Sequence, residues 1–226
     1  MKIHNRMHSK LAGIVAAMLV ALVSVGTVSA DVIADCTYDG YVAMGGTVFQ
    51  NSNNYLLPGN PDSAPEGPMQ TFGYAFCKFN TADLPTEAVS QAYLQLDVIA
   101  LQDGMTWPAT GTGNLGVFAV TADVAGIDAD NAGTFRDSIA DTATDSVSMT
   151  GEGLIYLDVT DIVNGWIDGD NDGLVLASPG GLMPRLHSSE TTDGLAPVIT
   201  SVPEPATMGL LACGALGLIS RRKRNG

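Results

Sequence analysis

The chain has 226 residues, with 24 acidic and 10 basic side chains and a formal net charge of −14. Most of the basic residues lie at the two ends, so the stretch from Asp31 to Glu204 holds all 24 acidic residues but only Lys78, Arg136 and Arg185 as cations. This excess argues against binding to nucleic acid or, unaided, to an anionic polysaccharide, because both need cationic groups facing phosphates or carboxylates. It suits a neutral ligand, or one bridged by divalent cations.

The first thirty residues have the three parts of a secretory signal. Basic residues at positions 2, 6 and 10 precede an apolar run from Leu11 to Val23, and the small residues Val-Ser-Ala follow at positions 28–30. This order predicts a signal peptide over residues 1–30, cleavage after Ala30, and export. The alternative is an uncleaved anchor, although the apolar run is near the lower length limit for crossing a bilayer.

Between residues 31 and 201, apolar residues recur mostly with a period of two and are interrupted by Gly, Pro, Asn and Asp. The clearest case is the alternation of apolar residues over 92–98, which predicts a strand with one buried face. The other predicted strands cover 41–49, 72–79, 115–120, 154–159, 174–177 and 196–201. Seven short strands predict one all-β domain over 31–201, a β-sandwich of the jelly-roll kind. Residues 50–70 and 123–150 are predicted to be loops with little regular structure.

One short segment has helical spacing instead. Its apolar residues at 162, 163, 166 and 167 are spaced as i, i+1, i+4 and i+5, and Thr160 or Asp158 is placed to cap the helix start. We expect one short helix packed on the sandwich. Trp166 is then a core residue rather than a platform for a ligand.

Two cysteines remain once the ends are removed, because Cys213 lies in the carboxy-terminal tail. In an oxidising compartment Cys36 and Cys77 are candidates for a disulfide. The alternative is that Cys77 is a small core residue of a strand, since it alternates with Ala75 and Phe79.

Residues 168–173 read Asp-Gly-Asp-Asn-Asp-Gly, which resembles the first half of a calcium loop. Asp168, Asp170 and Asp172 occupy its first, third and fifth positions and are the metal candidates, with calcium as the candidate ion. The twelfth position holds Pro179 in place of the bidentate Glu. A solvated acidic turn that leads into the next strand is the competing interpretation.

Several aromatic residues have the chemistry to stack on sugar rings. Trp107 is the favoured ligand-binding candidate because its surroundings, Asp-Gly-Met-Thr-Trp-Pro over 103–108, have the composition of a loop. The alternative is that Trp107 covers the core beneath that loop. The other aromatic candidates are Tyr41, Tyr55, Tyr74 and Tyr93.

The carboxy-terminal tail, residues 202–226, also has three parts. The motif Pro203-Glu204-Pro205 is followed by an apolar segment over 208–219 and then by Arg-Arg-Lys-Arg at 221–224. As a helix the apolar segment reaches roughly 20 Å against a hydrocarbon core of about 30 Å, so it is short for a transmembrane anchor. The basic residues would hold its end on the cytoplasmic side.

This tail resembles the PEP-CTERM sorting signal of bacteria that make extracellular polysaccharide. The resemblance implies cleavage near the motif by an exosortase, a membrane-embedded cysteine protease. It also implies transient anchoring in the inner membrane, then sorting to the cell envelope, the cell surface or the extracellular matrix. An ordinary carboxy-terminal anchor is the alternative.

The middle of the chain carries a second resemblance, over most of residues 35–201. Four blocks in order resemble the DNRLRE-type domain, a β-sandwich grouped with carbohydrate-binding module family ninety-six. The chain departs from that family where the segment 188–197 lacks the expected Arg, and it has few basic residues of the kind expected to contact acidic glycans. The resemblance therefore implies the fold rather than acidic-glycan specificity. The blocks are residues 78–80 with 84–85, residues 92–96, residues 157–166 and residues 171–174.

The sequence gives little support to enzymatic chemistry. Between the two ends there is one histidine, His187, and one lysine, Lys78, so no catalytic triad or multi-histidine metal centre is evident. No pair of carboxylates is marked for glycoside hydrolysis, which needs a separation of about 5 to 9.5 Å. We expect a non-catalytic carbohydrate-binding module exported to the cell surface. The alternative is a structural protein of the envelope or matrix with no specific sugar ligand.

Overall fold

The computed structural model describes residues 31–43, 46–51, 54–59, 73–82, 84–103, 109–179 and 182–201. The predicted signal peptide, the sorting tail and Trp107 lie outside these residues. Residues 31–201 form a compact unit. None of the helices in the described ranges has the length and apolar character needed to cross a membrane.

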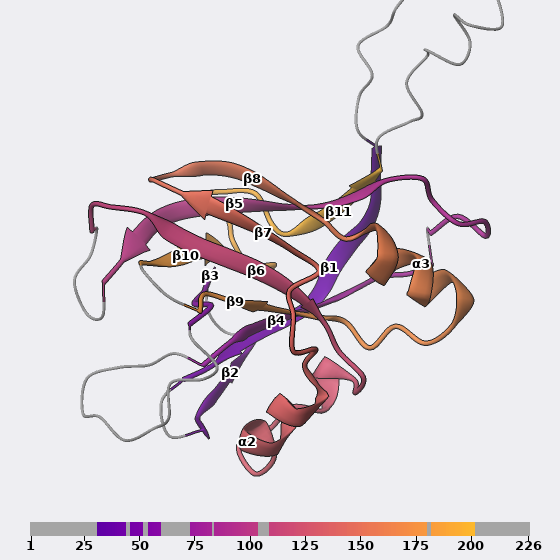
Figure 1. The fold of residues 1–226 in the computed structure, drawn as a ribbon, viewed down its shortest axis with the longest axis horizontal. Helices are drawn as coiled ribbons and strands as arrows, with labels where there is room; N and C mark the ends of the chain where they lie inside the picture. Colours follow the sequence, from indigo (N-terminus) through magenta and orange to yellow (C-terminus); the bar gives the residue numbers. More distant parts are fainter. Residues whose placement is uncertain are drawn as a thin grey trace, which may run out of the picture. The chain divides into compact units, whose positions relative to one another are not determined.

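The described part of the chain is mostly antiparallel sheet, and Figure 1 shows the strands as arrows. The short helical segments are η2 (Val124–Gly126), α2 (Ala132–Phe135), η3 (Arg136–Ser138) and α3 (Thr160–Asp168). The strands are β1 (Asp31–Val42), β2 (Val48–Gln50), β3 (Tyr55–Leu56), β4 (Ala75–Phe79), β5 (Ala92–Gln102), β6 (Gly113–Ala119), β7 (Asp145–Met149), β8 (Gly153–Asp158), β9 (Leu174–Ala177), β10 (Met183–His187) and β11 (Val198–Ser201).

Strand β1 belongs to both layers of the fold. Its first residues pair with β11; from Cys36 onward it pairs with β4, with an irregularity between Cys36 and Tyr38, and its last residues also pair with β2. The first sheet contains β5 at its centre, with β8 on one edge and β11 and β10 on the other. The second sheet runs β2-β1-β4-β9-β6-β7. The bulge in β1 lets one strand turn the corner between them.

The main core lies between the inner faces of the two sheets. Alternate residues of β5, from Ala92 to Val98, are at most 2% exposed and belong to one cluster with Cys77, Leu115 and Leu176 of the second sheet. Period-two burial on both sheets is what a sandwich requires. The predicted all-β sandwich is confirmed.

A second, smaller core covers the outer face of the second sheet. Phe76 and Val175 point away from the main core and pack with Val124 and Phe135 from the segment between β6 and β7. The Tyr74 hydroxyl donates to the carbonyl of Ala132 over 2.9 Å and fixes α2 on the sheet. The prediction of a loop with little regular structure over 123–150 was therefore wrong. Apolar side chains of that segment pack on the outer face of the second sheet, which would otherwise be exposed to solvent.

The predicted helix is present as α3, and α2 is a second one that the sequence did not suggest. The carboxylate of Asp158 accepts hydrogen bonds from the Thr160 main-chain N–H and hydroxyl, over 2.9 and 2.6 Å. Val163 and Trp166 are buried in the main core, where the Trp166 ring stacks on Phe79 with 6.0 Å between centroids. Trp166 is thus a core residue.

Several strand boundaries differ from the prediction. The single strand expected over 41–49 is divided between the end of β1 and β2, and the Ala43 N–H donates to the Thr47 carbonyl between them. Strands β3, β7 and β10 were missed because they are short or carry alternating serines, Pro184 and Arg185 in place of an apolar pattern. By contrast, β9 has the predicted bounds.

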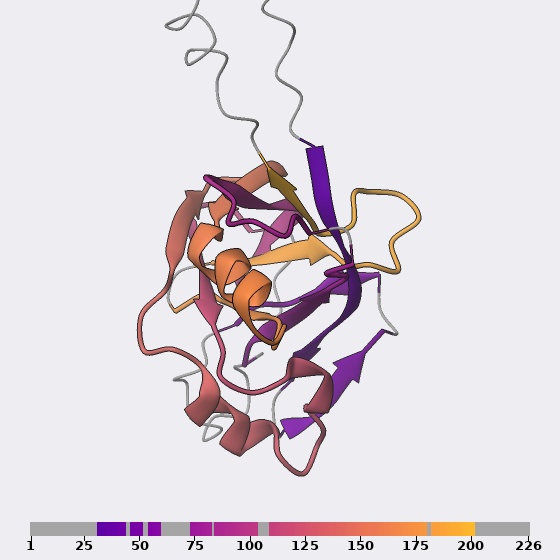
Figure 2. The ribbon, with the colours of Figure 1, turned by 90° about the vertical axis from the view of Figure 1, so that its right-hand side faces the viewer.

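The first and last strands of the domain are hydrogen-bonded neighbours. Asp31 pairs with Ser201, and β11 lies between β1 and β5. Figure 2 shows the outer ends of β1 and β11 side by side. The described domain therefore begins and ends at the same place.

Candidate functional site

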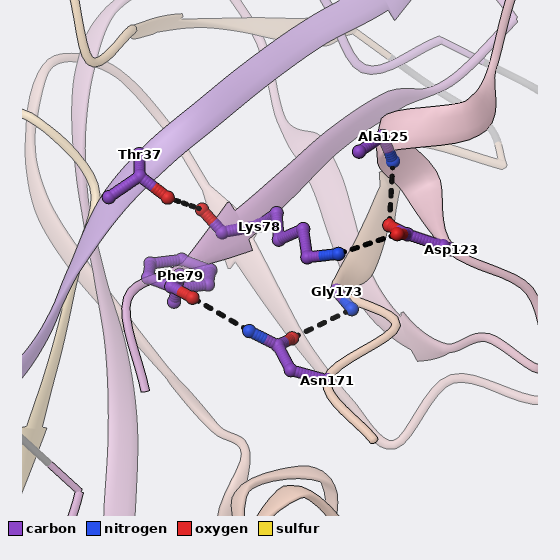
Figure 3. Close-up of polar contacts among 7 residues, drawn as sticks. All are labelled: Thr37, Lys78, Phe79, Asp123, Ala125, Asn171 and Gly173. Atoms are coloured by element: carbon purple, nitrogen blue, oxygen red, sulfur yellow. Dashed lines mark hydrogen bonds and ion pairs between the residues drawn. The ribbon is translucent and has the colours of Figure 1, made fainter. Parts of the chain in front are cut away.

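The acidic turn before β9 is organised around Asn171, not around its carboxylates (Figure 3). The Asn171 side chain donates to the Phe79 carbonyl over 2.7 Å and accepts from the Gly173 N–H over 2.9 Å. Gly173 has a φ of +85°, and a Cβ there would lie 2.7 Å from the Cys77 carbonyl oxygen, so only glycine fits. The turn connects α3 to β9 and is fixed to the end of β4 by the hydrogen bond to Phe79.

The predicted metal ligands are placed at the outside of this turn. Asp168 and Asp170 are exposed and Asp172 is half-buried, with its carbonyl accepting the Val124 N–H. Within the described ranges, no group of three or more His, Cys, Asp or Glu side chains is arranged to hold a metal ion. Calcium binding stays a prediction.

Thermal melting with calcium and with chelator tests it. The calcium hypothesis requires a rise in Tm that Asp170→Ala abolishes, because that change removes the carboxylate at the centre of the motif. An unchanged rise in the variant would place the ion elsewhere.

The few cations of the domain are engaged in contacts within it. The Lys78 ammonium lies 2.6 Å from Asp123 Oδ2 (Figure 3), and the Arg185 guanidinium lies 3.9 Å from the centre of the Tyr55 ring. Partial burial raises the pKa of Asp123, but Lys78 and the Ala125 N–H outweigh it, so the pKa lies below its ordinary value. These pairings leave little free positive charge for an anionic ligand.

The aromatic residues that were candidates for sugar stacking differ in burial and surroundings. Tyr41 and Tyr74 are buried, at 4% and 3% exposure, and belong to the cores. Tyr55 lies beneath Arg185, and Tyr93 lies on the outer face of the first sheet, diagonal to the half-exposed Tyr156. Trp107 falls outside the described residues, so its role stays a prediction.

A groove on the outer face of the second sheet is the candidate site in the described part of the chain. Its volume is about 750 Å³, within the usual range for a ligand site. The floor comes from β6, β7 and β9, and one wall comes from η3 and the residues after it. Asn114, Gly116 and Phe118 alternate with the core residues of β6, which places them on this outer face.

The groove combines one aromatic ring with several hydrogen-bonding groups. Phe118 is half-buried, and Gly116 gives its ring room, since a Cβ there would come within 3.0 Å of the ring. Asn114 accepts a hydrogen bond from the Ser148 hydroxyl over 2.6 Å, so the neighbouring strands hold each other's polar groups in place. Arg136 and Asp137 stand in the wall.

Sequence reasoning missed this groove. Its wall belongs to the segment predicted to be a loop, and Phe118 was assigned to a strand without regard to its face. The available signal was the alternation over 114–118, which separates core positions Leu115 and Val117 from an outward-facing aromatic residue.

The other predicted residues are placed as follows. His187 contacts the Thr191 hydroxyl at 2.8 Å through Nδ1, and its Nε2 lies 3.6 Å from Asp97 Oδ2, so it fixes the segment after β10. Cys36 and Cys77 lie on adjoining strands, and both are thiols in the structure. The disulfide between them stays a prediction.

Comparison with known proteins bears on the carboxy-terminal tail. The PEP-CTERM protein-sorting motif matches residues 201–224. The tail is a PEP-CTERM sorting signal. The chain is therefore exported to the cell envelope or surface and processed by exosortase. No curated protein matches the chain.

Proposed function

We propose that the domain is a non-catalytic carbohydrate-binding module, which attaches this PEP-CTERM protein to polysaccharide of the cell surface or extracellular matrix. The observation that carries the proposal is the groove over β6 and β7. A sugar ring presents an apolar face and a rim of hydroxyls, and the groove is lined by the Phe118 ring, the amide of Asn114 and the hydroxyls of Ser146 and Ser148.

The charge of the domain selects among polysaccharides. Lys78 and Arg185 are engaged within the fold, and carboxylates are abundant on the surface. A neutral chain, or one bridged by divalent cations, avoids the repulsion that an anionic chain would meet. The resemblance to the DNRLRE-type domain supports the same class of function.

We expect the compact unit of residues 31–201 to be retained on one class of insoluble or soluble polysaccharide, tested with calcium and again with chelator. Phe118→Ala should weaken retention by about five- to tenfold, because the loss of one stacked ring removes about 1 to 1.5 kcal/mol. Binding isotherms and affinity electrophoresis give the measurement.

Tyr156→Ala is the matched control, because Tyr156 is also an accessible aromatic residue but lies on the other sheet. It should leave binding unchanged. Thermal melting of both variants separates lost contacts from lost folding, since Phe118 also packs on the smaller core. Equal loss in the two variants would place the sugar outside the groove.

A structural role is the second candidate, and an exposed apolar face favours it. Leu154 and Tyr156 of β8 are 44% and 49% exposed, and Leu195, whose N–H donates to Asp97 beside them, is 49% exposed. Failure to bind every polysaccharide, together with self-association in sedimentation, would support packing between copies or neighbours in place of sugar binding.

A further inference from the structure

A buried polar cluster lies inside the sandwich, next to the bulge of β1. We call it the Asp39 cluster; its members are Cys36, Asp39, Cys77, Ser189 and Glu190. Asp39 is 1% exposed, and it pairs directly with Cys77 of β4, so their side chains share the inner face of the sheet. A carboxyl group in a hydrophobic interior is costly unless it is protonated or well hydrogen bonded.

Each member of the cluster contacts the Asp39 carboxyl or a neighbouring thiol. The Ser189 N–H donates to Asp39 Oδ2 over 2.6 Å, and the Cys36 thiol lies 3.8 Å from the same oxygen. A hydrogen bond with the Cys36 thiol, together with burial, raises the pKa of Cys77. Two thiols and a carboxyl group therefore meet at one point.

Glu190 completes the arrangement. Its Oε2 is buried and has no hydrogen-bond donor among the described residues. Glu190 lies close enough to Asp39 to contribute to the raised pKa of that carboxyl group. Burial, with a smaller contribution from Glu190, raises the pKa of Asp39 to about 7, against the lowering effect of Ser189.

We propose that Cys36 and Cys77 form a thiol–disulfide exchange site, in which Asp39 accepts the thiol protons and a small disulfide is the oxidant. Cys36 is the attacking thiol because it is half-buried, whereas Cys77 is fully buried. Cys77 is the resolving thiol.

The reaction has two displacements. The Cys36 thiol gives its proton to Asp39, and the thiolate attacks one sulfur of the oxidant; the oxidant's S–S bond breaks and its first thiolate leaves, to be protonated by water. After Asp39 has released that proton to solvent, the Cys77 thiol gives up its own. The Cys77 thiolate then attacks Cys36 Sγ and expels the second thiolate. The protein loses two electrons, and one disulfide is reduced to two thiols.

Burial makes Asp39 a stronger base than an ordinary aspartate, as a proton acceptor for a thiol requires. An ordinary aspartate is a much weaker base than a thiolate, and the raised pKa of Asp39 lessens this difference for the proton of Cys36, whereas the raised pKa of Cys77 makes the second proton transfer the harder one. The titratable groups that face Asp39 are Cys36 on its own strand, Cys77 on β4 and Glu190 on the segment after β10.

The test uses the full chain in mild detergent with Cys213→Ser, which leaves the two cysteines of the cluster. The reduced protein is mixed with oxidised glutathione and quenched in acid, and its intact mass is followed with time. We expect the mass to fall by that of two hydrogen atoms, with a rate that rises through pH 7. Asp39→Asn should slow the reaction by about tenfold or more. In the Cys77→Ser variant the reaction should stop at the mixed disulfide between Cys36 and glutathione.

Asp35→Asn, on the exposed side of the same strand, is the charge-matched control and should react at the native rate. Native-rate oxidation of Asp39→Asn, or no loss of mass in the native sequence, would overturn the proposal. Should Asp39→Asn fail to fold by circular dichroism, the pH profile of the native sequence decides. A rate that follows only the ordinary ionisation of a thiol, near pH 8.5, would rule out a role for Asp39.

Discussion

Replacing Trp166 by alanine will lower the free energy of unfolding by about 3 to 5 kcal/mol, which is typical for the loss of a buried indole. Trp166 is 8% exposed and stacks on Phe79, so it holds α3 against the end of the main core. The cavity left behind cannot collapse, because Asp158 and Asn164 fix the helix by hydrogen bonds. Chemical denaturation monitored by circular dichroism gives the measurement.

Tyr156→Ala is the control for this change, since it removes an aromatic ring that is 49% exposed. We expect it to alter the free energy of unfolding by less than about 1 kcal/mol. Similar values for the two variants would mean that α3 contributes little to the stability of the sandwich.

The stability of the reduced protein will fall as the pH rises from about 4 to about 7, through the ionisation of Asp39. Burial raises the pKa of Asp39 from 3.8 to about 7 in the folded state, so over this interval the folded chain keeps a proton that the unfolded chain has released. The contribution is fully present below pH 3.8 and is lost once the pH passes the folded value. Its size is about 4 kcal/mol for a shift of this extent.

The measurement is denaturant unfolding at several pH values under reducing conditions, with Asp39→Asn as the comparison. The difference in free energy of unfolding between native and variant should change with pH by a few kcal/mol, roughly. Asp35→Asn, whose carboxylate is exposed, should parallel the native curve. A constant difference between native and Asp39→Asn would show that Asp39 has an ordinary pKa.

How well the sequence predicted the fold depends on the kind of residue in each element. Strands β5 and β9 were located correctly because their buried faces consist of uninterrupted Val, Leu and Ala. α3 was found because four apolar residues cluster on one side of its turns. Strand β1 was largely missed, since its pairing changes from one sheet to the other at the bulge and its alternation changes phase there.

The candidate sites were harder to predict because they depend on contacts across the fold. The groove requires the 123–144 segment to lie on the outer face of the second sheet, which the small core of Phe76 and Phe135 brings about. No feature of the sequence marks Asp39 as buried. It is buried in the fold because the segment after β10 covers it. The acidic turn was conspicuous in the sequence, yet its structural residue is Asn171, the one side chain of the motif that is not charged.

The placement of β11 has a mechanical consequence for a protein held by its tail. The strand lies between β1 and β5, with four residue pairs to each, and the chain leaves it at Ser201 toward the sorting signal. Because antiparallel hydrogen bonds run perpendicular to the strands, tension along β11 loads both ladders in shear, so they must break together. While the tail is anchored, a force pulling on the domain would be borne by a strand that is hydrogen bonded on both sides.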